Sequence, residues 1–442
     1  MTNKTDNLIL RLALPSIVQN VTVPLLGLCD VAIMGHVGGA THIGAIAVGS
    51  MIFNVMYWMF GFLRMGTSGL TSQALGARRL DLVAVLLRRA LLLGVGLGLM
   101  IVALQLPLRG LSFVLMQPTA DVAQLCLPYY NICVWGAPAM LGLYGLTGWF
   151  VGMQNTRLPM LIAILQNVVN ILLSLLLVIG LGWGVSGVAT GTVVAQWVGF
   201  LVALALMWRY YGRVLRRHRG PLAAVFCGLG RFFRLNLDIF LRTFCLVAVN
   251  LYFTSAGAAQ GALTLAANTL LMQLFMFFSY IMDGFAYAGE ALSGRLHGAG
   301  NADGLRQMIR RLFRIGWLVV LIFTLAYWAL GPAFLRLLTT DTAVVSHARQ
   351  FLPWAVLIPL AGMAAFVWDG IYIGLTRSRG MLLSCLAASA AFFALWFALS
   401  PVMGNHALWL ALLVYLALRG IVQTWLYFGV KGGVPKSHLW KP

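Results

Sequence analysis

Leu8–Val37 reads LILRLALPSIVQNVTVPLLGLCDVAIMGHV, and this stretch indicates the class of fold. It is long and apolar enough to cross a bilayer as a helix, yet it contains an acidic residue, Asp30. An ionised side chain near the middle of a membrane helix costs on the order of 2.5–3.5 kcal/mol, so a functional role is the first hypothesis for it. Pro15 and Pro24 each remove a backbone hydrogen bond, and we therefore expect a helix that bends.

The whole chain has the composition of a membrane protein. Of its 442 residues, 61% are hydrophobic and 9% are charged, whereas soluble domains carry about 25% charged residues. We expect an all-α polytopic membrane protein, whose first span is too long to be a removable signal peptide. The twelve predicted spans are 8–36, 43–70, 83–106, 124–152, 158–181, 185–208, 236–257, 262–294, 311–331, 349–375, 381–402 and 406–428.

The positive charges gather on one side of these spans. Of the 30 Lys and Arg residues, 24 lie at the chain ends or in and beside the connections that follow even-numbered spans. This is the positive-inside pattern, so both termini are expected in the cytoplasm, and it explains the net charge of +20 without a nucleic-acid partner. The connections after odd-numbered spans hold Arg109, Arg336 and Arg349. The remaining three arginines, Arg64, Arg242 and Arg419, lie within spans.

The chain repeats itself. Gly76–Asp81 (GARRLD) returns as Gly298–Asp303 (GAGNAD), and Gly152–Arg157 (GMQNTR) returns as Gly374–Arg379 (GLTRSR), in both cases 222 positions later. Two matches in the same order at one offset indicate a duplication. Each half then holds six spans, so the halves enter the membrane in the same sense and are related by a pseudo-twofold axis along the membrane normal.

This duplication predicts the domain organisation. Residues 1–208 form a first six-helix lobe, and residues 235–442 form a second lobe with a C-terminal tail. Residues 209–234 between them are rich in arginine, and we expect a cytoplasmic linker that its charge holds to anionic headgroups.

Several stretches in both halves resemble one known family. They are Arg11–Gly38, Gly69–Ala77 (GLTSQALGA), Met282–Gly294 (MDGFAYAGEALSG), Trp368–Gly380 (WDGIYIGLTRSRG) and Gly404–Gly420 (GNHALWLALLVYLALRG). Together they resemble the multidrug and toxic compound extrusion (MATE) transporters, and the third resembles the DinF-type branch in particular. The resemblance implies an ion-coupled antiporter with two six-helix lobes, which exports amphipathic, often cationic compounds in exchange for H⁺ or Na⁺. It also implies that the acid of the first span, here Asp30, is the protonation site of proton-coupled members.

The residues around this acid are the next candidates. Met34 lies one turn after Asp30 on the same face and offers an adaptable apolar contact to varied ligands. The resemblance implies a polar network from spans 5 and 6 that faces Asp30. Its members here are Asn167, Asn170, Ser174 and Thr192. Similar proteins carry a second acid where this chain has Ser174, so Asp30 is expected to carry the proton coupling alone in its lobe. Ordinary interhelical hydrogen bonds are the alternative for the two asparagines and Thr192.

The second lobe has acids of its own. Asp283 and Glu290 are seven residues apart and hence on one helix face, and Asp369 lies toward the cytoplasmic end of span 10. They either line a substrate cavity or close an inner gate with arginines, for which the candidates are Arg295, Arg377 and Arg379. Asp238 and Arg242 are spaced i, i+4 and are expected to form a local ion pair near the interface. Span 7 has no deep acid, which disfavours the Na⁺-coupled scheme that the resemblance would otherwise allow.

These observations favour a proton-coupled exporter of amphipathic organic cations that works by alternating access as a monomer in the inner membrane of a bacterium. We expect no cofactor and no metal, since the six cysteines and seven histidines show no ligand spacing. The alternatives are Na⁺ coupling, a lipid or lipid-linked-sugar flippase, and a membrane-embedded enzyme. A flippase needs a basic cavity for phosphate, whereas the arginines within spans are expected at the interfaces. No nucleophile or metal motif indicates an enzyme.

Overall fold

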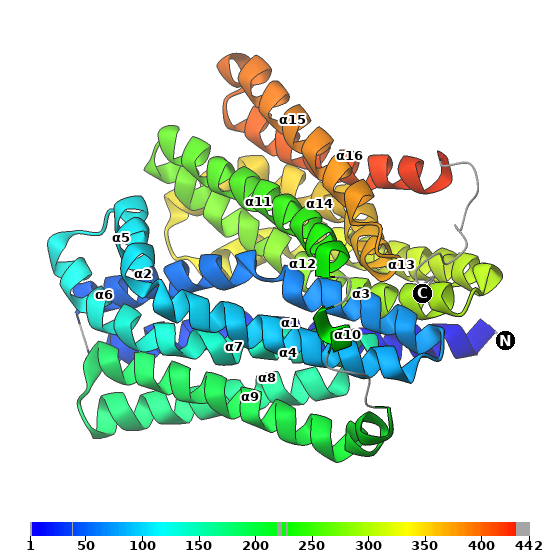
Figure 1. Cartoon of the computed structure of the whole chain (residues 1–442). Helices are drawn as coiled ribbons and strands as arrows, with labels where there is room; N and C mark the ends of the chain where they lie inside the picture. The colour runs from blue at the N-terminus through cyan, green and yellow to red at the C-terminus, as the bar shows by residue number, and fades with distance from the viewer. Residues whose placement is uncertain (1, 38, 219–222, 227–228, 430–442) are drawn as a thin grey trace. The chain divides into compact units, whose positions relative to one another are not determined.

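A computed structural model describes residues 2–37, 39–218, 223–226 and 229–429, and within these ranges it contains helices and no strand (Figure 1). The chain divides into two compact units. The N-unit is Val18–Phe233, and the C-unit joins Met1–Ile17 to Arg234–Pro442. The first helix, α1 (Thr2–Val37), therefore begins in the C-unit and ends in the N-unit.

The remaining helices follow the predicted spans. The first half contains α2 (Ala40–Met59), α3 (Phe62–Gly76), α4 (Leu80–Ala103), α5 (Gln105–Met116), α6 (Ala120–Cys133), α7 (Ala137–Gly152), α8 (Arg157–Leu175), α9 (Gly184–Arg217) and α10 (Ala223–Phe226). The second half contains α11 (Leu229–Ala259), α12 (Ala262–Gly298), α13 (Ala302–Leu338), α14 (Thr342–Gly374), α15 (Ser378–Met403) and α16 (Asn405–Gly429). A π-helical turn, Leu176–Gly180, extends α8.

Ten of the helical segments in the described ranges are long and apolar enough to cross a membrane. The other two predicted spans coincide with α1 and with α6 and α7 together. A short 3-10 turn, Val134–Gly136, separates α6 from α7, and Pro138 follows it at the start of α7, where a missing N–H costs little. The prediction of an all-α polytopic fold is confirmed.

The structure differs from the prediction in the connections. Span 2 is broken at Phe60–Gly61 into α2 and α3, and α5 forms a helix of 12 residues where we expected a loop. The predicted linker is helical at both ends, because α9 continues to Arg217 and α11 begins at Leu229. Between them, the Arg89 side chain of α4 donates a 2.9 Å hydrogen bond to the carbonyl of Val225 in α10. Linker residues 219–222 and 227–228 and tail residues 430–442 lie outside the described residues.

The duplication is visible in the backbone. Arg78 and Gly300, 222 positions apart, both have positive φ angles, of 57° and 67°. Gln154 and Thr376, also 222 apart, have φ angles of 61° and 55°. Each residue ends a helix with the same pair of reverse-turn hydrogen bonds, which satisfy the last carbonyls of that helix. The two halves therefore share the geometry of these turns at equivalent positions.

The same offset recurs in the tightest helix packing. In the N-unit, Gly148 and Gly152 of α7 lie against the backbone of α3, and in the C-unit Gly370 and Gly374 of α14 lie against the backbone of α12. A Cβ atom at any of these four positions would overlap backbone atoms of the facing helix. Both sites are small-xxx-small pairs, which let helices in membranes approach closely.

Candidate functional site

Asp30 is a buried carboxylate near the end of α1. It is 5% exposed, and its Oδ1 atom has no hydrogen-bond partner among the described residues. No ion pair involving Asp30 occurs in the part of the chain that the structure describes. Met34, one turn further along, is fully buried. Asp30 and Met34 are therefore both buried and lie one helical turn apart on α1.

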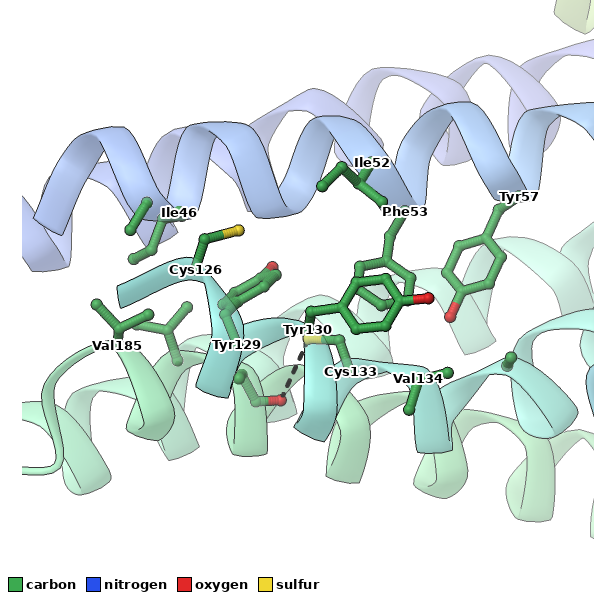
Figure 2. Close-up of a cluster of buried hydrophobic side chains, with 14 of the residues drawn as sticks. Ile46, Ile52, Phe53, Tyr57, Cys126, Tyr129, Tyr130, Cys133, Val134 and Val185 are labelled. Atoms are coloured by element: carbon green, nitrogen blue, oxygen red, sulfur yellow. Dashed lines mark hydrogen bonds between the residues drawn. The ribbon is translucent and has the colours of Figure 1, made fainter. Parts of the chain in front are cut away.

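An aromatic cluster from α2 and α6 lies in the same unit (Figure 2). It consists of Phe53, Tyr57, Tyr129 and Tyr130, all buried. The Phe53 ring lies 5.8 Å from Tyr57, 6.5 Å from Tyr129 and 5.3 Å from Tyr130, measured between ring centroids. The Tyr129 hydroxyl is 3.3 Å from Ser50 Oγ. Met34 belongs to the same hydrophobic core as this aromatic cluster.

Asp30 lies close to α6. Its charge acts on the side chains of Tyr129 and Cys133, which are one turn apart on that helix. A phenol and a thiol of α6 therefore lie within electrostatic range of the acid. Sequence reasoning missed both residues. The signal that could have found them is the i, i+4 placement of two polarizable side chains, each able to hydrogen-bond, inside span 4.

The predicted polar network exists in part. Asn170 donates a 2.9 Å hydrogen bond from Nδ2 to Thr192 Oγ1, which joins α8 to α9. Asn167 Nδ2 donates a 2.9 Å bond to the carbonyl of Thr22 on α1. Ser174 is fully buried, and its hydroxyl has no partner among the described residues. None of the four makes a hydrogen bond to Asp30 within the described ranges, although Asn167 reaches its helix two turns earlier.

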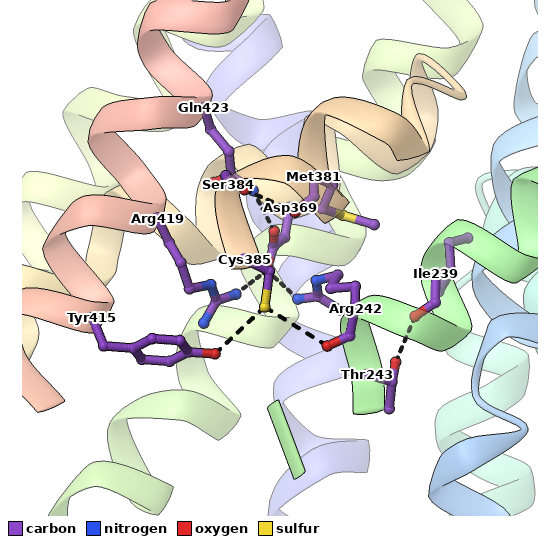
Figure 3. A network of polar contacts seen from close by, with 10 residues as sticks. All are labelled: Ile239, Arg242, Thr243, Asp369, Met381, Ser384, Cys385, Tyr415, Arg419 and Gln423. Atoms are coloured by element: carbon purple, nitrogen blue, oxygen red, sulfur yellow. Dashed lines mark hydrogen bonds and ion pairs between the residues drawn. The ribbon is translucent and has the colours of Figure 1, made fainter. Parts of the chain in front are cut away.

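The C-unit holds a second buried carboxylate, in an arginine cluster formed by Arg242, Asp369, Arg419 and Gln423 (Figure 3). Asp369 Oδ2 accepts hydrogen bonds from Nη2 of Arg242 and from Nη2 of Arg419, the latter 2.6 Å long. Asp369 Oδ1 accepts a 2.6 Å bond from Gln423 Nε2. Since both oxygens are taken by donors of α11 and α16, Asp369 is a fixed structural anion in this structure.

This cluster corrects one prediction. The expected local pair of Asp238 with Arg242 is wrong, because Arg242 pairs with Asp369 while Asp238 accepts a 2.7 Å bond from the Ser378 hydroxyl. Arg242 and Arg419 are buried within the protein, at 6% and 4% exposed. Burial without a partner would be very costly for a guanidinium group, and the carboxylate of Asp369 supplies that partner.

The other two acids of the second half lie on α12. Glu290 is 1% exposed, whereas Asp283 is half-buried, and both side chains interact with their surroundings. Neither is part of the arginine cluster. Asp369 does pair with arginines, as a gate would require, but its partners are not the three that the sequence suggested.

No group of three or more His, Cys, Asp or Glu residues that could hold a metal ion occurs within the described ranges. The five cysteines in that part of the chain are free.

Comparisons with known proteins agree with this architecture. The family model described as MatE matches residues 15–176 and 238–398, one match in each half. The chain is 37% identical to DNA damage-inducible protein F of Escherichia coli strain K12, over 94% of this chain and 91% of that protein. It is 21% identical to a probable multidrug resistance protein NorM of Thermotoga maritima, over 96% of this chain and 92% of that protein.

Solved structures show the same fold. The Vibrio cholerae MATE transporter VcmN in its bent form superposes with a TM-score of 0.85 at 18% identity, covering 96% of each chain. A transporter of the MOP superfamily from Pyrococcus furiosus, described as having a binding pocket of reverse polarity, superposes with a TM-score of 0.81 at 21% identity. That alignment covers 95% of this chain and 94% of that one.

Proposed function

Because this chain belongs to the MATE family of membrane transporters, we propose that it is a secondary active antiporter that exports amphipathic, cationic organic compounds in exchange for protons. The family predicted from the sequence is thereby confirmed, and with it a multi-pass membrane protein that is a transporter and not an enzyme. Relatives named as multidrug resistance proteins support export of varied compounds.

The observation that carries the proton coupling is the state of Asp30. It is buried, one of its oxygens lacks a partner, and it forms no ion pair in the described part of the chain. Burial disfavours a lone charged carboxylate, so the group gains by binding a proton or an organic cation. The aromatic cluster in the same hydrophobic core as Met34 favours an organic cation as the substrate, because aromatic faces attract positive charge. Asp369, which is already paired, cannot serve in this way without losing its arginines.

The mechanism we propose is an exchange at Asp30 during alternating access. In an outward-open state Asp30 takes up a proton, its neutral form releases the organic cation, and the protonated protein then resets. The hydrogen bond from Asn167 to the Thr22 carbonyl holds α8 to α1, and the bond from Asn170 to Thr192 holds α8 to α9 around this step. Ser174 supplies a further polar group. Met34 would contact the substrate, while Asp283 and Glu290 would attract cations to the second half of the path.

Exchange of one proton for one monovalent cation moves no net charge, so the pH gradient would drive it. Such a cycle needs no cofactor. We favour H⁺ over Na⁺ as the coupling ion. We propose a monomer in the bacterial inner membrane. The distribution of Lys and Arg supports cytoplasmic positions for both termini. Its partners are the lipid bilayer and small amphipathic substrates, and nucleic acid is not among them.

Transport in proteoliposomes tests this proposal. A fluorescent organic cation should leave vesicles of the native protein under an imposed pH gradient, and Asp30→Asn should reduce this flux at least about tenfold, since the amide cannot carry the proton. Asp121→Asn, an exposed acid on α6, is the matched control and should transport normally. Undiminished pH-driven efflux from Asp30→Asn, or efflux driven equally by a Na⁺ gradient, would overturn proton coupling at this residue.

A further inference from the structure

The arginine cluster carries more positive than negative charge. Arg242 and Arg419 supply two guanidinium groups, whereas Asp369 supplies one carboxylate and Gln423 is neutral. All four residues are at least nine-tenths buried. One positive charge is therefore left over in the interior of the C-unit, where an uncompensated charge costs several kcal/mol.

The hydrogen bonds of the cluster are unbalanced in the same sense. Nε of Arg242 and Nε of Arg419 are buried donors with no acceptor within the described residues. Both oxygens of Asp369 are occupied by other donors. Gln423 Oε1 is the one neutral acceptor of the cluster without a partner, and it cannot offset a charge. The two guanidinium groups thus have donors to spare for an incoming acceptor.

Among the residues that the structure describes, the surrounding elements supply no second anion by direct contact. On α11, Asp238 is one turn from Arg242 but bonds to Ser378. On α15, Cys385 Sγ lies 3.7 Å from the carbonyl of Arg242 and 3.6 Å from the Tyr415 hydroxyl of α16. The guanidinium carbon of Arg419 lies 5.5 Å from the centroid of the Tyr415 ring, a cation–π contact that softens the excess charge without cancelling it.

We propose that the arginine cluster is a binding site for one anionic group, a carboxylate or a phosphate, carried either by a transported amphiphile or by a phospholipid headgroup. Paired guanidinium groups bind such planar or multi-oxygen anions through charge-assisted hydrogen bonds. In this proposal the anion reaches the buried cluster when the C-unit opens during the transport cycle. Such a site would add zwitterionic and anionic amphiphiles to the substrates. This consequence for transport rests on the proposed export function.

Binding is tested first, without transport. The full chain is purified in a neutral detergent, and its melting temperature is followed against sodium acetate and sodium phosphate at constant ionic strength. We expect saturable stabilisation of the native protein. Arg242→Gln and Arg419→Gln each leave a neutral Arg–Asp pair that should fold, and each should weaken anion binding at least about tenfold. Arg349→Gln, an exposed arginine on α14, is the control and should respond as the native protein does.

Removal of the carboxylate should have the opposite effect. Asp369→Asn raises the charge of the cluster and frees both Nη2 donors, so anions should bind about tenfold tighter than in the native protein. If this variant does not fold, the two arginine variants decide the question alone. No anion response in the native protein, or the same response in the native protein, both arginine variants and the control, would overturn the proposal.

The source of the anionic group is tested in vesicles. Rhodamine B, which bears a free carboxylate, is compared with rhodamine 6G, a related cationic dye that bears an ester instead. If the group belongs to the substrate, Arg419→Gln should reduce efflux of rhodamine B and spare rhodamine 6G in phosphatidylcholine vesicles. If it belongs to a lipid, phosphatidylglycerol should abolish acetate binding by competition. Anion binding without efflux of either dye would refute the proposed export function but not the anion site. Efflux without anion binding would refute the anion site but not the export function.

Discussion

Asp30 and Asp369 are both buried carboxylates inside membrane helices, but their surroundings differ. Asp369 is held by two arginines and a glutamine, whereas Asp30 has an oxygen with no partner in the described part of the chain. Removing a paired buried anion leaves its partners uncompensated, whereas a buried carboxylate without an ion-pair partner is itself destabilising and suggests a functional role. The proposed function therefore assigns proton exchange to Asp30 and a structural role to Asp369.

This division predicts opposite effects on stability. Asp369→Asn should lower the free energy of unfolding by about 3–5 kcal/mol, because it leaves two buried guanidinium groups without their counter-ion. Asp30→Asn should leave the stability unchanged or raise it, since the amide removes a buried charge. Unfolding of both variants in one detergent, compared with the native protein, checks the difference. An equal loss of stability in the two variants would contradict the assignment of roles.

Helices and turns of this chain were largely predictable, because hydrophobic length and the repeated turn sequences are local properties. The partner of Arg242 was not. The i, i+4 spacing to Asp238 shows which residues share a helix face, but the acid that binds Arg242 lies 127 positions away on a helix that only tertiary packing brings near. The neighbours of Asp30 on α6 escaped prediction for the same reason. The helix α5 was missed because it is too short to span a membrane.

The turn after α3 gives a prediction at the scale of helices and turns. Arg78 has φ of 57°, where a side chain is strained, and its counterpart 222 positions later is Gly300. Arg78→Gly should therefore stabilise the protein by about 0.5–1 kcal/mol, the relief of strain less the added entropy of the unfolded chain. Thermal unfolding measures the gain.

The neighbouring Ala77 provides the control for this turn. Its φ of −74° is ordinary, so Ala77→Gly should destabilise the protein slightly. The reverse change, Gly300→Arg, should lower the melting temperature. A loss of stability in Arg78→Gly would show that the positive φ is not strained there.

At the level of the whole molecule, the two halves share a frame and differ in chemistry. Glycine pairs at equivalent positions bring α7 onto α3 in the N-unit and α14 onto α12 in the C-unit. The acid with an unpaired oxygen lies in one unit and the arginine cluster in the other. The two halves therefore share their helix packing, whereas their buried polar groups, Asp30 in one and the arginine cluster in the other, differ.

Alanine at the glycine contacts tests this shared frame. Gly148→Ala and Gly370→Ala should each cost about 1–3 kcal/mol, because the new Cβ meets backbone that cannot move aside. Since the two positions belong to different units, the double variant should lose the sum to within about 0.5 kcal/mol. Gly96→Ala is the control, as a Cβ there meets nothing within 4 Å and alanine favours the helix. Unaffected stability in both single variants would refute the tight packing.

The first helix has a mechanical consequence. Its residues up to Ile17 belong to one unit and those from Val18 onward to the other, without a break in the helix. Any rotation of one unit against the other must then twist or flex α1 itself, and Pro15 and Pro24 lie on either side of the crossing. Asp30 lies on the part of α1 that belongs to the N-unit. If the proposed protonation of Asp30 moves this part of α1, the continuous helix would transmit that movement to both units without a relay of side chains.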